Sequence, residues 1–280
     1  MTLHPEIIEV VKRALAEDIG TGDVTSELTI PPDRQAEGKF FARANIVVCG
    51  ANLLPLIFDL RGGVEKLEIY KQNGDPAQDG EAVAYVKGNA RTLLECERAA
   101  LNFMQRLSGI ATKAKLYTDA VKGTKTKVLD TRKTTPGLRR LEKMAAAAGG
   151  VTNHRMGLFD AVLIKNNHIT AAGGVRQALT TAIPEAKKRN IPLEIEVRTW
   201  GELNDALECG AQKLLLDNLT PEEAKRWIDH VNGRALCEIS GGVTLETIRP
   251  YAEAGADFIS CGAITHSAIA VDLNFRVNLL

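Results

Sequence analysis

Six short apolar runs occupy the second half of the chain, and most of them end in a polar or charged residue. Helix-length stretches separate these runs, which is typical of successive strand–helix units in a parallel sheet or barrel. Because the active site of an α/β barrel lies at the carboxyl ends of its strands, the residues that end the runs are the candidates for chemistry. The runs are 128–130, 161–165, 193–197, 213–217, 237–240 and 258–262.

The first half has a different pattern. Residues 4–17 have the apolar spacing of an amphipathic helix, and a Gly/Asp-rich turn follows at 17–23. Residues 36–90 alternate as antiparallel strands do, and 91–107 return to helical spacing. We therefore expect an N-terminal domain of residues 1–108, to which 271–280 return, and a strand–helix domain of residues 109–270.

Composition and charge indicate which broad class of protein this chain belongs to. The chain has 280 residues, of which 45% are hydrophobic and 25% charged, with a formal net charge of zero. This balance predicts a soluble globular protein and argues against a general nucleic-acid binder. The longest apolar stretch, 46–58, is too short and too interrupted to span a bilayer. The chain start has no signal-like pattern and the five cysteines show no paired spacing, so we expect a cytoplasmic protein without a membrane partner.

Two cationic patches follow predicted strands. Arg132 and Lys133 lie in the loop 130–137, where a guanidinium fork and an ammonium suit carboxylates and phosphates. Alone, this patch is equally consistent with a solvated basic loop. His154 and Arg155 form a second patch, and Lys165 ends the next strand run. Together they predict an anionic ligand with several negative groups.

Carboxylates end the two following runs. Glu194 and Glu196 share one strand face, and Asp217 ends the neighbouring run. Glu196 and Asp217 are suited to Mg²⁺, which binds carboxylates and bridges to phosphates. An alternative is that one of the two glutamates is a buried acid that pairs with Lys165.

Glycines follow the last two strand runs. Ser240, Gly241 and Gly242 follow one run, and Gly262 follows the other. Loops of this kind let backbone N–H groups approach a phosphate, and phosphate sites of barrels commonly use the last two strand–helix loops. Simple tight turns are the alternative. Arg98, on the helix 91–107, has only a local explanation, an ion pair with Glu95 three residues earlier.

At this point the chain resembles the quinolinate phosphoribosyltransferase family over nearly its whole length. No matching segment is specific alone, but the set is highly specific. The resemblance implies an α/β fold with an incomplete α/β barrel and a smaller N-terminal antiparallel α+β sandwich domain. It also implies a homodimer with shared active sites and leaves open an oligomer of dimers. The segments are 17–23, 97–103, 107–112, 130–137, 153–155, 163–168, 215–218 and 239–242.

The resemblance further implies the reaction: quinolinate and phosphoribosyl pyrophosphate give nicotinate mononucleotide, pyrophosphate and CO₂, with Mg²⁺. Lys165, Glu196 and Asp217 would be catalytic, the two carboxylates also holding the metal. By the same resemblance Arg132, His154, Arg155 and Lys165 would hold the quinolinate carboxylates, with Arg98 reaching in from the partner subunit. The remaining substrate-binding residues would be Thr131 and Lys133 near the pyrophosphate, and Ser240, Gly241, Gly242 and Gly262 at the 5′-phosphate.

Two departures from the family pattern are visible: Asn166 stands where the family usually has Asp, and alanines fill 145–148. Asn166 removes a charge next to Lys165, which affects the expected rate and pH profile. Two other readings remain. A Schiff-base aldolase would use Lys165 but does not explain the other cations. A non-catalytic relative that binds another oxyanion is expected to lose part of the set Arg132, His154 and Arg155, which is intact here.

Overall fold

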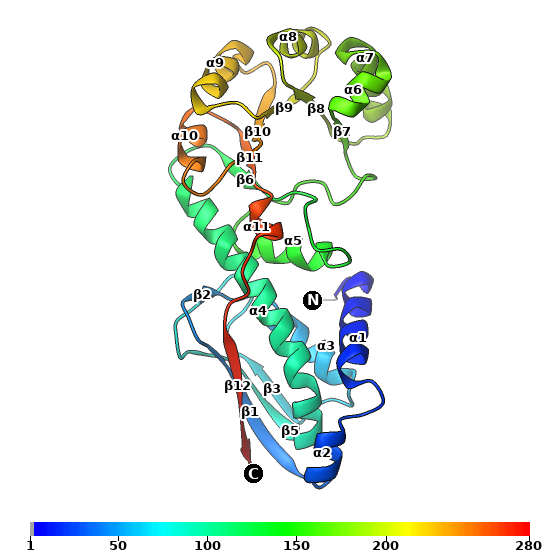
Figure 1. Cartoon of the computed structure of the whole chain (residues 1–280), viewed down its shortest axis with the longest axis vertical. Helices are drawn as coiled ribbons and strands as arrows, with labels where there is room; N and C mark the ends of the chain where they lie inside the picture. The colour runs from blue at the N-terminus through cyan, green and yellow to red at the C-terminus, as the bar shows by residue number, and fades with distance from the viewer. Residues whose placement is uncertain (1–2) are drawn as a thin grey trace. The chain divides into compact units, whose positions relative to one another are not determined.

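A computed structural model describes residues 3–280 and divides the chain into two compact units. One unit comprises the residues up to Lys115 together with Thr134–Gly150 and Ile264–Leu280. The other comprises Leu116–Lys133 and Val151–Ala263. Their sheets differ in strand direction (Figure 1), so we call them the antiparallel unit and the parallel unit.

A four-stranded sheet with the order β12-β1-β5-β3 forms the body of the antiparallel unit. The last strand of the chain returns to the first, and Phe40 pairs with Phe275 across them, with ring centroids 4.5 Å apart. Gly38 makes room for this contact, since a Cβ there would lie 2.2 Å from the Phe275 ring. The strands are β1 (Gln35–Ala42), β3 (Lys66–Ile69), β5 (Ala82–Asn89) and β12 (Leu273–Leu279), beside the short pair β2 (Ile46–Val47) and β4 (Pro76–Ala77).

The predicted N-terminal helix is confirmed as α1 (Pro5–Ile19). Proline suits the first helical turn, and Ile7, Val11 and Leu15 are buried on one side. The Ala-rich stretch forms a helix that ends at Gly149. Further helices are α2 (Val24–Thr29), α5 (Arg139–Ala148) and α11 (Ala263–His266).

Residues 46–58 contain less strand and more helix than the β pattern predicted for 36–90. Only β2 is extended, and η1 (Ala51–Leu53) and α3 (Leu54–Asp59) follow. Gly50 turns the chain with φ +97°, and a Cβ there would lie 3.3 Å from Met104 Cα. Pro55 then fits the first turn of α3. A tight turn against a neighbouring helix therefore outweighed the local strand pattern.

The helix predicted over 91–107 is much longer, because α4 runs from Ala90 to Ala120. The domain boundary expected at residues 108–109 thus lies within a continuous helix. Gly109 does not break this helix: a Cβ there would lie 2.1 Å from the backbone oxygen of Ile269, so glycine permits a close backbone approach. Within residues 3–280, no helix is long and apolar enough to cross a membrane.

All six strand runs of the second half are confirmed. They form one parallel sheet with the order β6-β11-β10-β9-β8-β7, in which the consecutive strands β7 to β11 are neighbours and β6 lies beside β11. In the part of the chain that the structure describes, β6 and β7 are the two ends of the sheet, which gives an incomplete barrel. The strands are β6 (Lys127–Leu129), β7 (Val162–Ile164), β8 (Leu193–Val197), β9 (Lys213–Asp217), β10 (Leu236–Ser240) and β11 (Phe258–Ser260).

Helices cover one face of this sheet (Figure 1). The buried apolar side chains Ile195, Leu214 and Ile239 each follow a charged residue on their strands. Glu194, Lys213 and Glu238 therefore lie on the opposite face from the apolar set. The covering helices are α6 (Asn166–Ala172), α7 (Val175–Lys188), α8 (Trp200–Glu208), α9 (Pro221–Val231) and α10 (Ile248–Glu253).

Candidate active site

The carboxyl ends of β9 and β10 are joined in register. Asp217 pairs with Ser240, and the N–H of Asn218 donates to the backbone oxygen of Ser240 at 2.9 Å. Gly241 has φ +98°, and a Cβ there would lie 2.3 Å from Asn218 Oδ1. Glycine at this position therefore lets the loop after β10 approach the end of β9 closely. Gly262 follows β11, the neighbouring strand on the other side of β10.

Glu196 and Asp217 lie on adjacent strands and on the same face. Register pairs Glu196 with Leu215, so Asp217 is two residues further toward the carboxyl end. Glu196 is buried, whereas Asp217 is half-buried and accepts from Asn218 Nδ2 at 2.6 Å. These oxygen donors fit the preference of Mg²⁺ for carboxylates with retained waters.

Lys165 is exposed directly after β7, and its backbone N–H donates to Nδ1 of His168 at 2.9 Å. A cation that sequence reasoning did not include lies next to it in the loop after β8. Arg198 donates to Asn166 Oδ1, and its Nε lies 4.0 Å from Glu196 Oε1. The sequence did offer a signal for including Arg198 in the site, because it lies two residues after Glu196, just past the end of β8.

Arg132 and Arg155 come close together from two segments. Residues after β6 run beside residues 152–155 through the bridge between Leu129 and Thr152. Burial first, and then the charge of Arg132, lower the pKa of Arg155. The proximity of two guanidinium groups is unfavourable unless an anion lies between or beside them. Thr131 accepts from the backbone N–H of the exposed Lys133 at 3.0 Å and so shapes the same loop.

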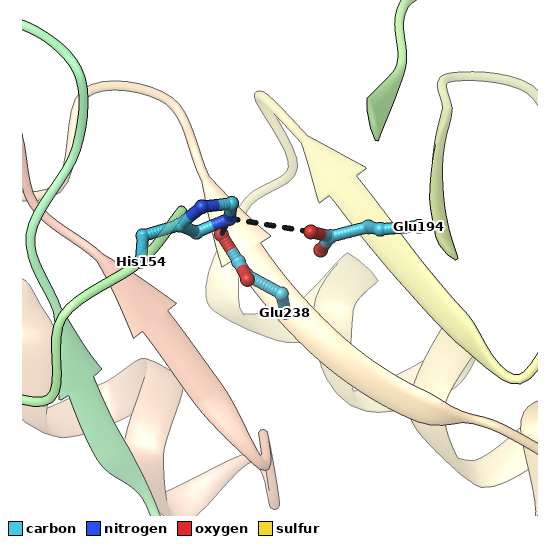
Figure 2. A group of neighbouring side chains, drawn as sticks. All are labelled: His154, Glu194 and Glu238. Carbon is cyan, nitrogen blue, oxygen red and sulfur yellow. Dashed lines mark hydrogen bonds and ion pairs between the residues drawn. The ribbon is translucent and has the colours of Figure 1, made fainter. Parts of the chain in front are cut away.

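His154 is held by the residues around it. Its backbone N–H donates to Asp130 Oδ1 at 2.7 Å, and its Nδ1 accepts the backbone N–H of Arg155 at 2.7 Å. On the other side of the ring, Nε2 lies 3.2 Å from Glu194 Oε2 and 3.5 Å from Glu238 Oε1 (Figure 2). The two glutamates come from β8 and β10 and point toward the ring.

Lys213 completes a buried charged group, which we call the inner cluster: His154, Glu194, Lys213 and Glu238. Its Nζ lies 2.6 Å from Glu238 Oε2 and 3.3 Å from Glu194 Oε2. The alternative of a buried glutamate is thus confirmed for Glu194, but its partner is Lys213 and not Lys165. Sequence reasoning missed Lys213 and Glu238, although their alternation with the apolar strand positions was a signal.

The charges of the inner cluster depend on one another. Burial opposes ionisation throughout, but bonds to the two glutamates outweigh it and raise the pKa of His154 to about 9. The pKa of Glu238 is lowered to about 2, because His154 and Lys213 outweigh its burial. For Glu194 burial dominates and raises the pKa. Glu238 is therefore the firmly ionised partner of the two cations.

The inner cluster also has the composition of a metal site. Among residues 3–280, His154, Glu194 and Glu238 form a group of three potential metal ligands, because their ligand atoms all lie within 4.8 Å of one another. Lys213 already places a cation against both carboxylates, and a metal ion there would be repelled by its ammonium. The arrangement therefore fits an internal ion-pair group better than a metal centre.

A cavity of about 320 Å³ opens beside the inner cluster. His154, Arg155, Glu194 and Lys213 line it together with Phe258, whose ring lies 4.7 Å from Lys213 Nζ. The cavity brings together only His154 and Arg155 from the predicted site. The other predicted residues of the parallel unit, apart from the buried Glu196, lie in the loops and strand ends at the carboxyl edge of the sheet.

Arg98 lies in the antiparallel unit, exposed on α4. Its local explanation fails, because Glu95 pairs instead with Arg61, whose guanidinium lies 2.6 Å from it. The predicted role in a partner's active site stays a prediction.

Comparisons with known proteins cover both units. The family model described as quinolinate phosphoribosyl transferase, N-terminal domain, matches residues 23–108, and the one described as the C-terminal domain of the same enzyme matches 110–276. The chain is 41% identical to the chloroplastic nicotinate-nucleotide pyrophosphorylase [carboxylating] of Arabidopsis thaliana, over 98% of this chain and 84% of that protein. It is 36% identical to a probable enzyme of the same name from Bacillus subtilis, over 99% of this chain and 95% of that one.

A solved structure agrees with these matches. The nicotinate-nucleotide pyrophosphorylase from Francisella tularensis superposes with a TM-score of 0.92 at 36% identity, over 99% of this chain and 98% of that chain. The predicted fold class, an incomplete α/β barrel with a smaller antiparallel domain, is confirmed.

Proposed function

Because this chain belongs to the quinolinate phosphoribosyltransferase family, we propose that it transfers the phosphoribosyl group of phosphoribosyl pyrophosphate to quinolinate with loss of CO₂. The products are nicotinate mononucleotide and pyrophosphate, which places the enzyme in NAD biosynthesis. The observation that carries the proposal is the match of both domains, joined to a cationic site on the parallel sheet.

Charge explains why the site has so many cations. Quinolinate is a dianion, and a pair of arginines held close together binds such a ligand well. Arg132 and Arg155 supply that pair, and the raised pKa of His154 adds positive charge at neutral pH. The exposed Lys165 supplies a further cation at the end of β7.

Departure of pyrophosphate leaves positive charge on the ribose. Carboxylates stabilise such a charge electrostatically, and Glu196 and Asp217, on one sheet face, are the residues that we propose for this role. The same two residues would hold Mg²⁺, which supplies charge neutralisation for the pyrophosphate when bound. Loss of CO₂ then leaves electron density on the pyridine ring, for which Lys165 is the neighbouring cation.

In this proposal, the loops after β10 and β11 bind the 5′-phosphate. Gly241 and Gly242 both have positive φ, a backbone conformation in which successive N–H groups can face an anion. Ser240 and Gly262 complete this phosphate loop set, while Lys133 and Thr131 serve the pyrophosphate from the loop after β6.

A homodimer is part of the proposal, with Arg98 completing the partner's site, and so is a location in the cytoplasm. The test mixes Arg98→Ala protein with Lys165→Ala protein under conditions that exchange subunits. If sites are shared, each heterodimer has one site with both lesions and one intact site, so activity reappears. No recovery in proven heterodimers would remove Arg98 from the partner's site.

The proposed reaction itself is tested by following nicotinate mononucleotide and CO₂ with quinolinate, using nicotinate as the control substrate. We expect turnover with quinolinate and much lower kcat/KM with nicotinate, which has one carboxylate fewer. Equal kcat/KM for the two substrates would contradict the proposal.

A further inference from the structure

The inner cluster contains charged residues for which the proposed reaction has no use. Lys213, Glu194 and Glu238 are at most 22% exposed as side chains, and they lie on strands below the predicted carboxyl-end residues. A lysine and two glutamates are costly to bury, because each ion loses its hydration. Apolar side chains would fill the same positions at lower cost, so the cluster calls for a role other than packing.

The only predicted site residue in the cluster, among those the structure describes, is His154. Its ring is contacted at both nitrogens: Nε2 faces the two glutamates and Nδ1 accepts from the Arg155 backbone. A neutral ring that accepts at Nδ1 carries its proton on Nε2. A charged ring also has a proton on Nε2, but its second proton on Nδ1 replaces the contact with the Arg155 N–H. In both states, therefore, the glutamates hold the same edge of the ring.

We propose that Glu194 and Glu238 are positioning residues of the anion site, which act through His154 to place its ring and the neighbouring backbone of Arg155. The proposal rests on the proposed function only in that the ligand is a pyridine dicarboxylate. The Lys213 ammonium contacts both glutamates and offsets the repulsion between their carboxylates, which allows both to face one ring. The arrangement is comparable to carboxylates that orient metal-bound histidines, here with an anionic ligand in place of the metal.

Charged groups from four places in the sheet surround the ring. Asp130 accepts its backbone N–H after β6, Glu194 comes from β8, Lys213 from β9 and Glu238 from β10. Arg155 follows directly in sequence, and the carboxylate of Asp160 is also close to it. Negative groups outnumber positive ones, so the ring is expected to keep its positive charge until alkaline pH.

Glu238 is the better position for a test, because Glu194 lies two residues from Glu196 on the same strand. We expect Glu238→Gln to raise KM for quinolinate roughly tenfold, the loss of one charge-assisted contact, while KM for phosphoribosyl pyrophosphate stays near that of the wild type. In a His154→Ala background the same substitution should add nothing further. A full additional loss there would overturn the proposal, because Glu238 would then act without His154.

The pH profile separates positioning from a merely structural role. In the wild type, kcat/KM for quinolinate should fall as pH rises through about 9, when the ring loses its positive charge. Glu238→Gln should move this fall to lower pH, because one of the two carboxylates that favour the charged ring is gone. An unmoved profile with an unchanged KM would overturn the proposal.

Asp257→Asn is the matched control. Asp257 precedes β11, accepts the backbone N–H of Cys237 at 2.9 Å and pairs with Lys125, but it belongs to no predicted site. It should alter stability without altering KM or the pH profile. If Glu238→Gln does not fold, the pair Lys213→Met and Glu238→Leu removes both charges, and its quinolinate KM must still rise. An inactive wild type would instead count against the proposed function.

Discussion

One face of the parallel sheet carries two layers of polar side chains, and the charges of these layers are paired in different ways. The inner layer, Glu194, Lys213 and Glu238, forms short ion pairs among its own members and with His154. The outer layer, Glu196, Asp217 and Ser240, lies two to four residues further along the same strands and is less buried at Asp217 and Ser240. The chain thus neutralises the charges of the inner layer internally, whereas the charges at the strand ends are the ones that we propose for substrate and metal.

Breaking the inner layer should have the largest effect on stability. Lys213→Met leaves two buried glutamates without their ammonium, and we expect a loss of about 3–5 kcal/mol in the free energy of unfolding. Urea denaturation measures this loss. The control is Lys225→Met, which breaks an exposed pair with Asp229 and should cost less than about 1 kcal/mol. Equal losses for the two variants would contradict the distinction between the layers.

The inner layer should also make stability depend on alkaline pH. The pKa of His154 is raised to about 9 from an ordinary value near 6.5, so its contribution is full below about pH 6.5 and is lost as pH rises through about 9. The free energy of unfolding should fall by up to roughly 3 kcal/mol over that range. Because other groups titrate there, the readout is the difference between wild type and His154→Gln. A difference that does not change with pH would contradict this.

Substitutions in the outer layer should affect activity more than stability. Glu196→Gln is expected to lower kcat/KM about 100-fold, the cost of losing one electrostatic contact to the transition state, with little change in stability. Glu194→Gln, two residues earlier, should mainly lower stability and affect quinolinate binding through His154. Activity in excess chelator and thermal unfolding of both variants provide the comparison. A Glu196→Gln enzyme with wild-type turnover would remove it from the metal site.

The sequence was sufficient to predict the outer layer but not the inner one. Apolar runs that end in Lys165, Asp217 and Ser240 reveal strand ends because parallel strands are buried on both faces. The partner of Glu194 depends instead on strand register, which placed Lys213 beside it and not Lys165. Cross-strand pairing is set by the assembled sheet, so one strand's sequence does not contain it.

Local signals were also misleading where tertiary contacts decide the backbone. The apolar run 46–58 contains β2 and then helical turns, because Gly50 and Pro55 redirect the chain. Gly109 indicated the end of a helix but lies within α4, where it permits contact with the backbone at Ile269. A glycine that breaks a helix and a glycine that makes room for a neighbouring segment look the same in sequence.

The smallest effect is expected at Asn166, where the family usually has aspartate. Asn166 accepts a hydrogen bond from Arg198, so an aspartate would form an exposed ion pair with the same guanidinium. Exposed pairs contribute about 0.2–1 kcal/mol, and Arg198 would offset most of the new charge before it influenced Lys165. Asn166→Asp should therefore change kcat/KM less than about fivefold, with Asn167→Asp as the neighbouring control. A change well beyond that, or a displaced pH optimum in Asn166→Asp alone, would show that the added charge acts on Lys165 despite Arg198.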